Sequence, residues 1–255
     1  MKKIVKALLG VNIISLKHLV TGHPMRFMGA ASKAFTAARA WSPNTDAARL
    51  PAISLDELLG DRKPRISLSA MRYEEGMLPS RDAFVLLASL AAESPREVLE
   101  IGTFMGHTTR LLAENCESAT IHTIDLPPDY SAEKDENAGI PKDDFHLIGR
   151  RVVGREFLDQ ECSARIKQHF ADTAILDFQE VGSPTFFFID GSHTYEYCKN
   201  DSEKCFELCK GKGVFFWHDV NDLHPGVVRF VNEWRKMGRD IRRVRDTDLG
   251  YWKGF

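Results

Sequence analysis

The distribution of apolar and polar positions predicts strands that alternate with helices. Short apolar runs, typical of buried strands, cover Glu97–Ile101, Thr120–Asp125, Ile166–Phe170, Thr185–Asp190 and Val214–Asp219. A helix is expected over Arg81–Glu93, where Phe84, Leu87, Ala88 and Ala91 recur at helical spacing and Pro95 follows. This alternation predicts a mostly parallel sheet with helices on both faces.

The ends of the chain depart from this pattern. Ile241–Arg245 and Leu249–Lys253 are short strand candidates, close enough to form a hairpin that adds an antiparallel edge. Residues 41–68 contain three prolines and are interpreted as a connector. Residues 126–165 are polar and long for a connection in a compact domain, which indicates a lid, a binding loop or a disordered segment.

Charge separates the N-terminal segment from the rest. Residues 1–50 carry eight Lys or Arg and one acid, so they are +7 in a chain whose net charge is −2. Lys6, Asn12 and Lys17 interrupt the apolar run, which therefore falls short of the roughly 20 residues of a membrane span. Three interpretations stand: the arm contacts an anionic membrane surface, packs against a partner subunit in a homo-oligomer, or covers the catalytic domain.

Five cysteines without paired spacing favour a reducing, cytoplasmic location. Cys198, Cys205 and Cys209 fall on a predicted helix, where the outer two lie roughly 16 Å apart, so they are expected in the core rather than in a zinc site. A basic cluster over residues 235–245 is interpreted as a solvated surface or a site for an acidic acceptor. It lacks interleaved aromatic residues, so no nucleic-acid partner is predicted.

The first predicted strand leads into a glycine-containing turn, VLEIGTFMGHTTRLL. Gly102 permits backbone conformations and a close ligand approach that a side chain would block, and a helix beginning near Gly106 offers free N–H groups. The spacing is not G-x-G-x-x-G, which weakens the prediction of a dinucleotide cofactor. Asp125 ends the second strand, where it can accept hydrogen bonds from ribose hydroxyls, and Asp172 follows the third strand near an adenine pocket.

These features resemble the class I S-adenosylmethionine-dependent methyltransferases over residues 70–255, with residues 1–69 as a basic helical arm and connector. The resemblance implies a Rossmann-like, doubly wound, seven-stranded α/β sheet with an antiparallel C-terminal hairpin strand. It implies that Glu100 and Gly102 lie at the methionine end of S-adenosylmethionine, Asp125 at its ribose and Asp172 near its adenine. The full set of expected cofactor-binding residues is Glu100, Gly102, Thr103, Gly106, Asp125 and Asp172.

Two further strands end in residues suited to chemistry, IDGSH and FFWHDV. Asp190 and Asp219 should face each other, and a divalent cation, most simply Mg²⁺, would relieve their repulsion. The pattern resembles metal-dependent O-methyltransferases of small molecules and sugars, which implies that Asp190 and Asp219 are metal ligands and His193 the general base. The other interpretation of His193 places it in the first helical turn, with Ser192 as N-cap.

His218 stands where relatives commonly have an acid or amide, which widens the choice of metal to Zn²⁺, Mn²⁺ or Fe²⁺. Strand alternation favours the other interpretation, in which His218 turns into the core. His107 is expected near the cofactor or in a local role, and His224 at the border of the acceptor site.

The predicted function is thus methyl transfer to a hydroxyl of a small molecule, such as a sugar or glycan precursor. An NAD-dependent oxidoreductase and a non-catalytic module that binds the cofactor or a membrane remain alternatives. An iron-dependent hydroxylase is less favoured, because the sequence shows no clear two-histidine, one-carboxylate pattern.

Overall fold

The computed structural model describes residues 46–47, 49–130 and 151–254. Most of the basic N-terminal arm and the centre of the expected lid, residues 131–150, lie outside this range. The chain divides into two units, and the larger one spans Leu50–Val220 and His224–Phe255. In the described part of the smaller unit, the Ala47 N–H donates to the Asp222 carboxylate at 3.5 Å.

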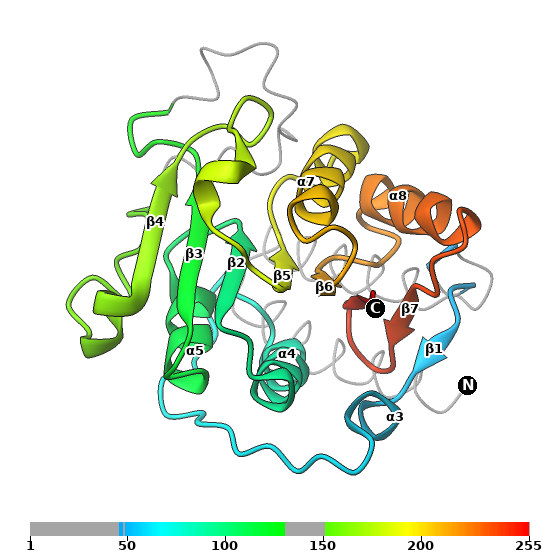
Figure 1. The fold of residues 1–255 in the computed structure, drawn as a ribbon, viewed down its shortest axis with the longest axis horizontal. Helices are drawn as coiled ribbons and strands as arrows, with labels where there is room; N and C mark the ends of the chain where they lie inside the picture. The colour runs from blue at the N-terminus through cyan, green and yellow to red at the C-terminus, as the bar shows by residue number, and fades with distance from the viewer. Residues whose placement is uncertain (1–45, 48, 131–150, 255) are drawn as a thin grey trace, which may run out of the picture. The chain divides into compact units, whose positions relative to one another are not determined.

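The larger unit contains an eight-stranded sheet with the order β1-β7-β8-β6-β5-β2-β3-β4 (Figure 1). Its strands are β1 (Ala52–Ile53), β2 (Glu97–Ile101), β3 (Thr120–Asp125), β4 (Ile166–Phe170), β5 (Phe186–Ile189), β6 (Val214–Trp217), β7 (Arg242–Val244) and β8 (Gly250–Lys253). Among the strands of the described residues, only β8 runs antiparallel to its neighbours, β6 and β7. The predicted doubly wound, mostly parallel sheet is confirmed, but it has eight strands where seven were expected.

The additional strand comes from the segment interpreted as a connector. Ile53 of β1 pairs in parallel with Val244 of β7, and helix α3 (Leu55–Leu59) follows directly. Ser54 caps this helix: its Oγ accepts from the Glu57 N–H at 3.2 Å, while the Glu57 carboxylate accepts from the Ser54 N–H at 2.8 Å. The sheet therefore begins before residue 70, where the sequence placed the start of the domain.

Helices α3, α4 (Ser80–Glu93) and α5 (His107–Asn115) cover one face of the sheet, and α7 (Tyr195–Leu208) and α8 (Pro225–Lys236) cover the other (Figure 1). Two short 3₁₀ helices, η3 (Glu161–Arg165) and η4 (Phe178–Val181), flank β4. Successive residues of β5 point to opposite faces: Phe186 and Phe188 join the cluster beneath α4, whereas Phe187 stacks on Phe215 with ring centroids 4.5 Å apart. Because both faces are covered, the strand is apolar throughout.

Phe84 of α4 and Arg239 of the basic cluster over residues 235–245 are both at least partly exposed. Phe84, one of the residues whose spacing predicted α4, is 42% exposed, whereas Leu86, Leu87 and Leu90 of this helix are buried. In the basic cluster, Arg239 lies over the Trp234 ring at 4.3 Å.

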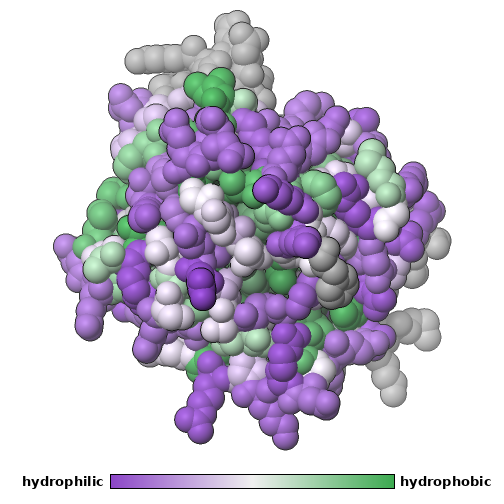
Figure 2. Space-filling view, viewed as in Figure 1, coloured by the Kyte–Doolittle hydropathy of each residue, from purple (hydrophilic) through white to green (hydrophobic). Residues whose placement is uncertain are grey.

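The face in Figure 2 is largely hydrophilic, with small groups of hydrophobic side chains. Among the described residues, no helix has the length and apolar character needed to cross a bilayer.

Candidate active site

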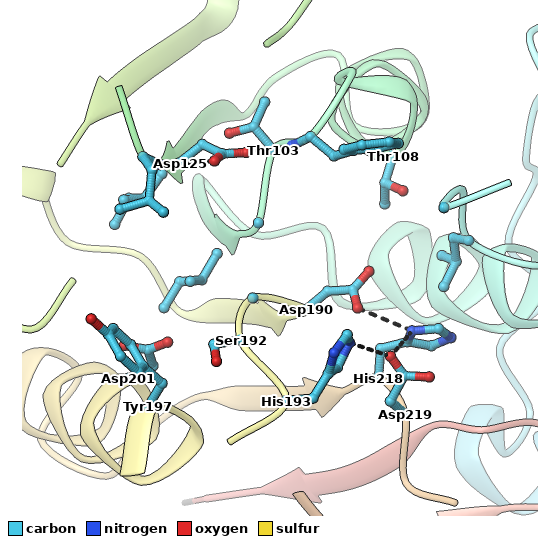
Figure 3. A pocket seen from close by; sticks show the side chains of 18 of the residues that line it. Thr103, Thr108, Asp125, Asp190, Ser192, His193, Tyr197, Asp201, His218 and Asp219 are labelled. Atoms are coloured by element: carbon cyan, nitrogen blue, oxygen red, sulfur yellow. Dashed lines mark hydrogen bonds and ion pairs between the residues drawn. The ribbon is translucent and has the colours of Figure 1, made fainter. Parts of the chain in front are cut away.

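The carboxyl ends of β2, β3, β5 and β6 surround a cavity of about 460 Å³, the location at which open α/β sheets bind ligands. Asp190, His193, His218 and Asp219 gather at one end, and Asp125 and Tyr197 lie away from them (Figure 3). The cavity therefore brings together the acids from both halves of the sheet that the sequence singled out.

Gly102 lines the cavity and has the kind of backbone conformation that was predicted to require glycine. Its φ is +101°, and a Cβ at this position would lie 2.1 Å from the Asp190 carbonyl oxygen. The glycine therefore allows the ends of β2 and β5 to approach each other. Gly106, with φ +83°, packs against the Phe157 ring and does not line the cavity. Its contact with the cofactor therefore stays a prediction.

Glu100 is fully buried beneath the cavity rather than in its lining. The Thr109 hydroxyl and the Thr123 hydroxyl, the latter at 2.6 Å, both donate to Glu100 Oε2. Burial raises the pKa of Glu100 to about 8, despite these hydrogen bonds. Thr103 does line the cavity, and its hydroxyl shares a hydrogen bond of 2.7 Å with Thr123. Glu100 thus supports the wall of the cavity from below.

Asp125 lines the cavity with its carboxylate fixed by three donors. It accepts hydrogen bonds from the N–H groups of Phe104 at 2.6 Å and Leu126 at 2.7 Å, and from the Arg151 guanidinium at 3.1 Å. Burial raises the pKa of Asp125, and the charge of Arg151 opposes this shift. The turn that holds this acid includes Phe104 at φ +49°. Arg151, which follows the undescribed part of the loop, was not predicted as a site residue.

Asp172 also lines the cavity, where it meets α7. The Tyr197 hydroxyl lies 3.1 Å from both carboxylate oxygens of Asp172, and burial together with this carboxylate raises the pKa of Tyr197. Asp201, one helical turn beyond Tyr197, is buried, which raises its pKa to about 6. Neither α7 residue was predicted, although their i, i+4 spacing after IDGSH places them on one helix face.

At the other end of the cavity, His218 joins three carboxylates. Its Nδ1 lies 3.0 Å from Asp190 Oδ1 and 3.2 Å from Asp219 Oδ2, and its Nε2 lies 3.3 Å from Asp82 Oδ2. Burial alone lowers the pKa of His218, but the charges of Asp190 and Asp219 outweigh it, so the pKa lies well above its ordinary value. The interpretation that His218 turns into the core is therefore wrong: it lines the cavity between the two predicted ligands.

His193 and His224 lie on the same aspartate. His193 Nε2 is 2.8 Å from Asp219 Oδ2, and His224 Nδ1 is 3.2 Å from Asp219 Oδ1. Burial raises the pKa of Asp219, but the charge of His218 and the hydrogen bond from His193 hold it well below its usual range. His193 precedes α7, whose N-cap is Thr194, so the interpretation of His193 as a helical residue capped by Ser192 is wrong.

Two sets of potential metal ligands share Asp219. One is the predicted set of Asp190, His218 and Asp219, and the other consists of His193, Asp219 and His224; within each set the ligand atoms lie within 4.8 Å of one another. The second set is a two-histidine, one-carboxylate arrangement, which the sequence did not reveal because His224 comes from a different loop. His107 contributes to the lining, with its Nε2 3.1 Å from the Ala70 carbonyl oxygen.

Residues 99–220 match the family model described as a methyltransferase domain. The structure is similar to the SAH-bound methyltransferase PaMTH1 of Podospora anserina, at 14% identity and a TM-score of 0.50, over 69% of this chain and 80% of that one. It is also similar to the O-methyltransferase NovP, at 13% identity and a TM-score of 0.50, over 68% and 78% of the two chains. No curated protein sequence matches the chain significantly. These findings confirm the predicted Rossmann-like methyltransferase fold, with a methyltransferase domain matched over residues 99–220.

Proposed function

The chain carries a methyltransferase domain, and we propose that this domain transfers a methyl group from S-adenosylmethionine to a hydroxyl oxygen of a small molecule, such as a sugar. The observation that supports this most is the arrangement of His193 and Asp219 in the same cavity as Asp125 and Asp172. One end of the cavity offers acids for an adenosine group, and the other end offers a base.

The residues at the adenosine end fit the cofactor. Asp125 has its carboxylate held in the cavity wall by two backbone N–H groups, so its position is fixed before a ribose binds. Asp172 and Tyr197 form a polar edge suited to an adenine amine. When bound, S-adenosylmethionine supplies an electrophilic methyl group on a sulfonium.

His193 is proposed as the base that takes the hydroxyl proton. Its Nε2 faces Asp219, a contact that places the ring hydrogen on Nε2, so that Nδ1 carries the electron pair that accepts the proton. An alcohol is a weak nucleophile until this proton leaves, so a positioned imidazole contributes about 10²–10⁴-fold to the rate. Asp219 thereby holds the base in the correct tautomer.

A divalent cation is proposed on Asp190, His218 and Asp219. Two partly buried carboxylates and one imidazole nitrogen converge there, a donor set that fits Mg²⁺ or Mn²⁺. The cation would lower the pKa of a hydroxyl bound to it. Cytoplasmic location, membrane contact and homo-oligomer formation through the N-terminal arm remain predictions.

The test is to incubate the full chain with methyl-labelled S-adenosylmethionine and a panel of sugars and phenols, with added Mg²⁺ or with EDTA. Label recovered in an ether linkage, and lost when EDTA is present, is the expected result. Label on nitrogen or carbon acceptors would contradict the proposed acceptor class, and EDTA-resistant transfer would contradict the metal.

A further inference from the structure

Asp219 contacts two imidazoles, those of His193 and His224, that are not part of the metal site proposed above. We propose that His193, Asp219 and His224 form a binding site for a transition-metal dication such as Zn²⁺, and that its occupation blocks the base. The blocking effect rests on the proposed function, whereas the site itself rests on geometry alone.

The two imidazole nitrogens of this set lie on either oxygen of the same carboxylate, that of Asp219. Asp219 Oδ2 lies 2.8 Å from His193 Nε2, and Asp219 Oδ1 lies 3.2 Å from His224 Nδ1. The two imidazole rings are close, with centroids 4.2 Å apart and planes inclined by 32°. His224 Nδ1 is buried and faces Asp219 Oδ1, so a cation that binds here would take the place of the proton between these two atoms.

The backbone holds the three residues in place. His224 is the N-cap residue of α8, and the first turn of that helix packs directly on the backbone of His193. A Cβ on Gly226 would lie 2.5 Å from the His193 carbonyl oxygen, so this contact requires glycine. Asp219 has φ +58°, a conformation that a residue other than glycine adopts only when its surroundings enforce it. The ligands are therefore preorganised by two separate loops.

The donor types decide which cation this set favours. Imidazole nitrogens suit Zn²⁺, Fe²⁺, Ni²⁺ and Cu²⁺, whereas Mg²⁺ prefers oxygen ligands. The His193 set has two nitrogens and one carboxylate, while the Asp190 set has one nitrogen and two carboxylates. In the Asp190 set, His218 Nδ1 already lies close to both carboxylates. A transition-metal dication is therefore expected to prefer the His193 set.

Occupation of this set changes the chemistry of His193. A neutral imidazole that binds a cation through Nε2 carries its hydrogen on Nδ1, so it has no electron pair left to accept a proton. Zn²⁺ should therefore inhibit methyl transfer, while Mg²⁺ should not. The inhibition would act at the base, leaving the adenosine end of the cavity unchanged.

The site can be tested by Zn²⁺ affinity, measured on the chelator-stripped full chain by competition with a fluorescent zinc chelator. His224→Gln should weaken Zn²⁺ binding more than about tenfold, the scale seen even for residues that only support a ligand. Asp190→Asn should leave the affinity essentially unchanged, as should the control His169→Gln on β4. The proposal would be overturned if Asp190→Asn lowered the Zn²⁺ affinity as much as His224→Gln does, or if His224→Gln did not lower it at all.

A second measurement uses the wild-type chain alone, so it does not depend on the folding of a variant. Because the two sets share Asp219, the cations are titrated separately: the Kd for Zn²⁺ should be lower than the Kd for Mg²⁺, and a lower Kd for Mg²⁺ would contradict a nitrogen-rich site. Calorimetry with S-adenosylmethionine on the same samples separates the two proposals. Cofactor binding without Zn²⁺ binding overturns only the zinc site, and Zn²⁺ binding without cofactor binding overturns the methyl-transfer proposal instead.

Discussion

His193 Nε2 lies 2.8 Å from Asp219 Oδ2, although the two residues follow different strands (Figure 3). Strands β5 and β6 are parallel neighbours, so their carboxyl ends deliver Asp190 and His193 from one loop and His218 and Asp219 from the next to the same place. A carboxylate that orients an imidazole in this way is the arrangement expected for a general base.

Replacing the base should affect turnover more than cofactor binding. His193→Gln is expected to lower kcat by about 10²–10⁴-fold, because the acceptor hydroxyl would lose its proton acceptor. The Kd for S-adenosylmethionine should stay unchanged, since His193 lies at the other end of the cavity. Steady-state kinetics and calorimetry check both values, with His169→Gln as the matched control. A variant with wild-type kcat would show that His193 is not the base.

Asp125 should contribute mainly to cofactor affinity. A hydrogen bond to a charged group is worth about 1.5–3 kcal/mol, so Asp125→Asn is expected to weaken S-adenosylmethionine binding by roughly tenfold to a hundredfold. Asp177→Asn, at the N-cap of η4 and outside the cavity lining, is the control. Equal affinities of the two variants, measured by calorimetry, would exclude Asp125 as a cofactor ligand.

A comparison of alanine variants at Gly102 and Gly238 distinguishes the cost of a steric clash from the cost of a positive φ. Both have positive φ, at +101° and +96°, but a Cβ at Gly238 meets nothing within 4 Å, whereas one at Gly102 meets Asp190. Gly102→Ala should therefore lower the free energy of unfolding by about 1–3 kcal/mol more than Gly238→Ala. Urea denaturation measures this difference. Equal losses would mean that the contact between β2 and β5 adjusts without cost.

The buried Glu100 carboxyl predicts a specific dependence of stability on pH. Its pKa is about 8 in the folded chain against an ordinary 4.5, so the folded state holds the proton more tightly. The stability it contributes is fully present below the unfolded pKa and is lost as pH rises through the folded pKa. From about pH 5 to about pH 9, wild type should therefore lose stability relative to Glu100→Gln. If the melting temperatures of the two proteins changed equally with pH across this range, the raised pKa of Glu100 would be contradicted.

Much of the fold could be predicted because burial on both faces leaves a clear apolar pattern. The bounds predicted for β2, β3 and β4 agree with the structure. The two-residue β1 left no such signal, since Ala52 is exposed and only Ile53 is buried. Its pairing with β7 depends on tertiary packing that a local pattern does not encode.

The site was predicted less completely, for physical reasons that differ between residues. His218 was expected to follow the alternation of β6, but the strand ends at Trp217, so alternation does not apply to it. Asp82 is a buried acid on α4, and its partners, His218 and the Asp248 N–H, lie far away in the sequence. His224 reaches Asp219 because α8 packs on the loop that carries His193. Such contacts depend on the positions of helices, which the sequence pattern does not specify.

The most direct test of the central claim is calorimetry of the full chain with S-adenosylmethionine and, separately, with NADH. We expect binding of S-adenosylmethionine that Asp125→Asn weakens, and no comparable binding of NADH, because the turn between β2 and α5 lacks the three-glycine spacing of a dinucleotide site. Binding of NADH in preference to S-adenosylmethionine, or no binding of S-adenosylmethionine at all, would contradict it.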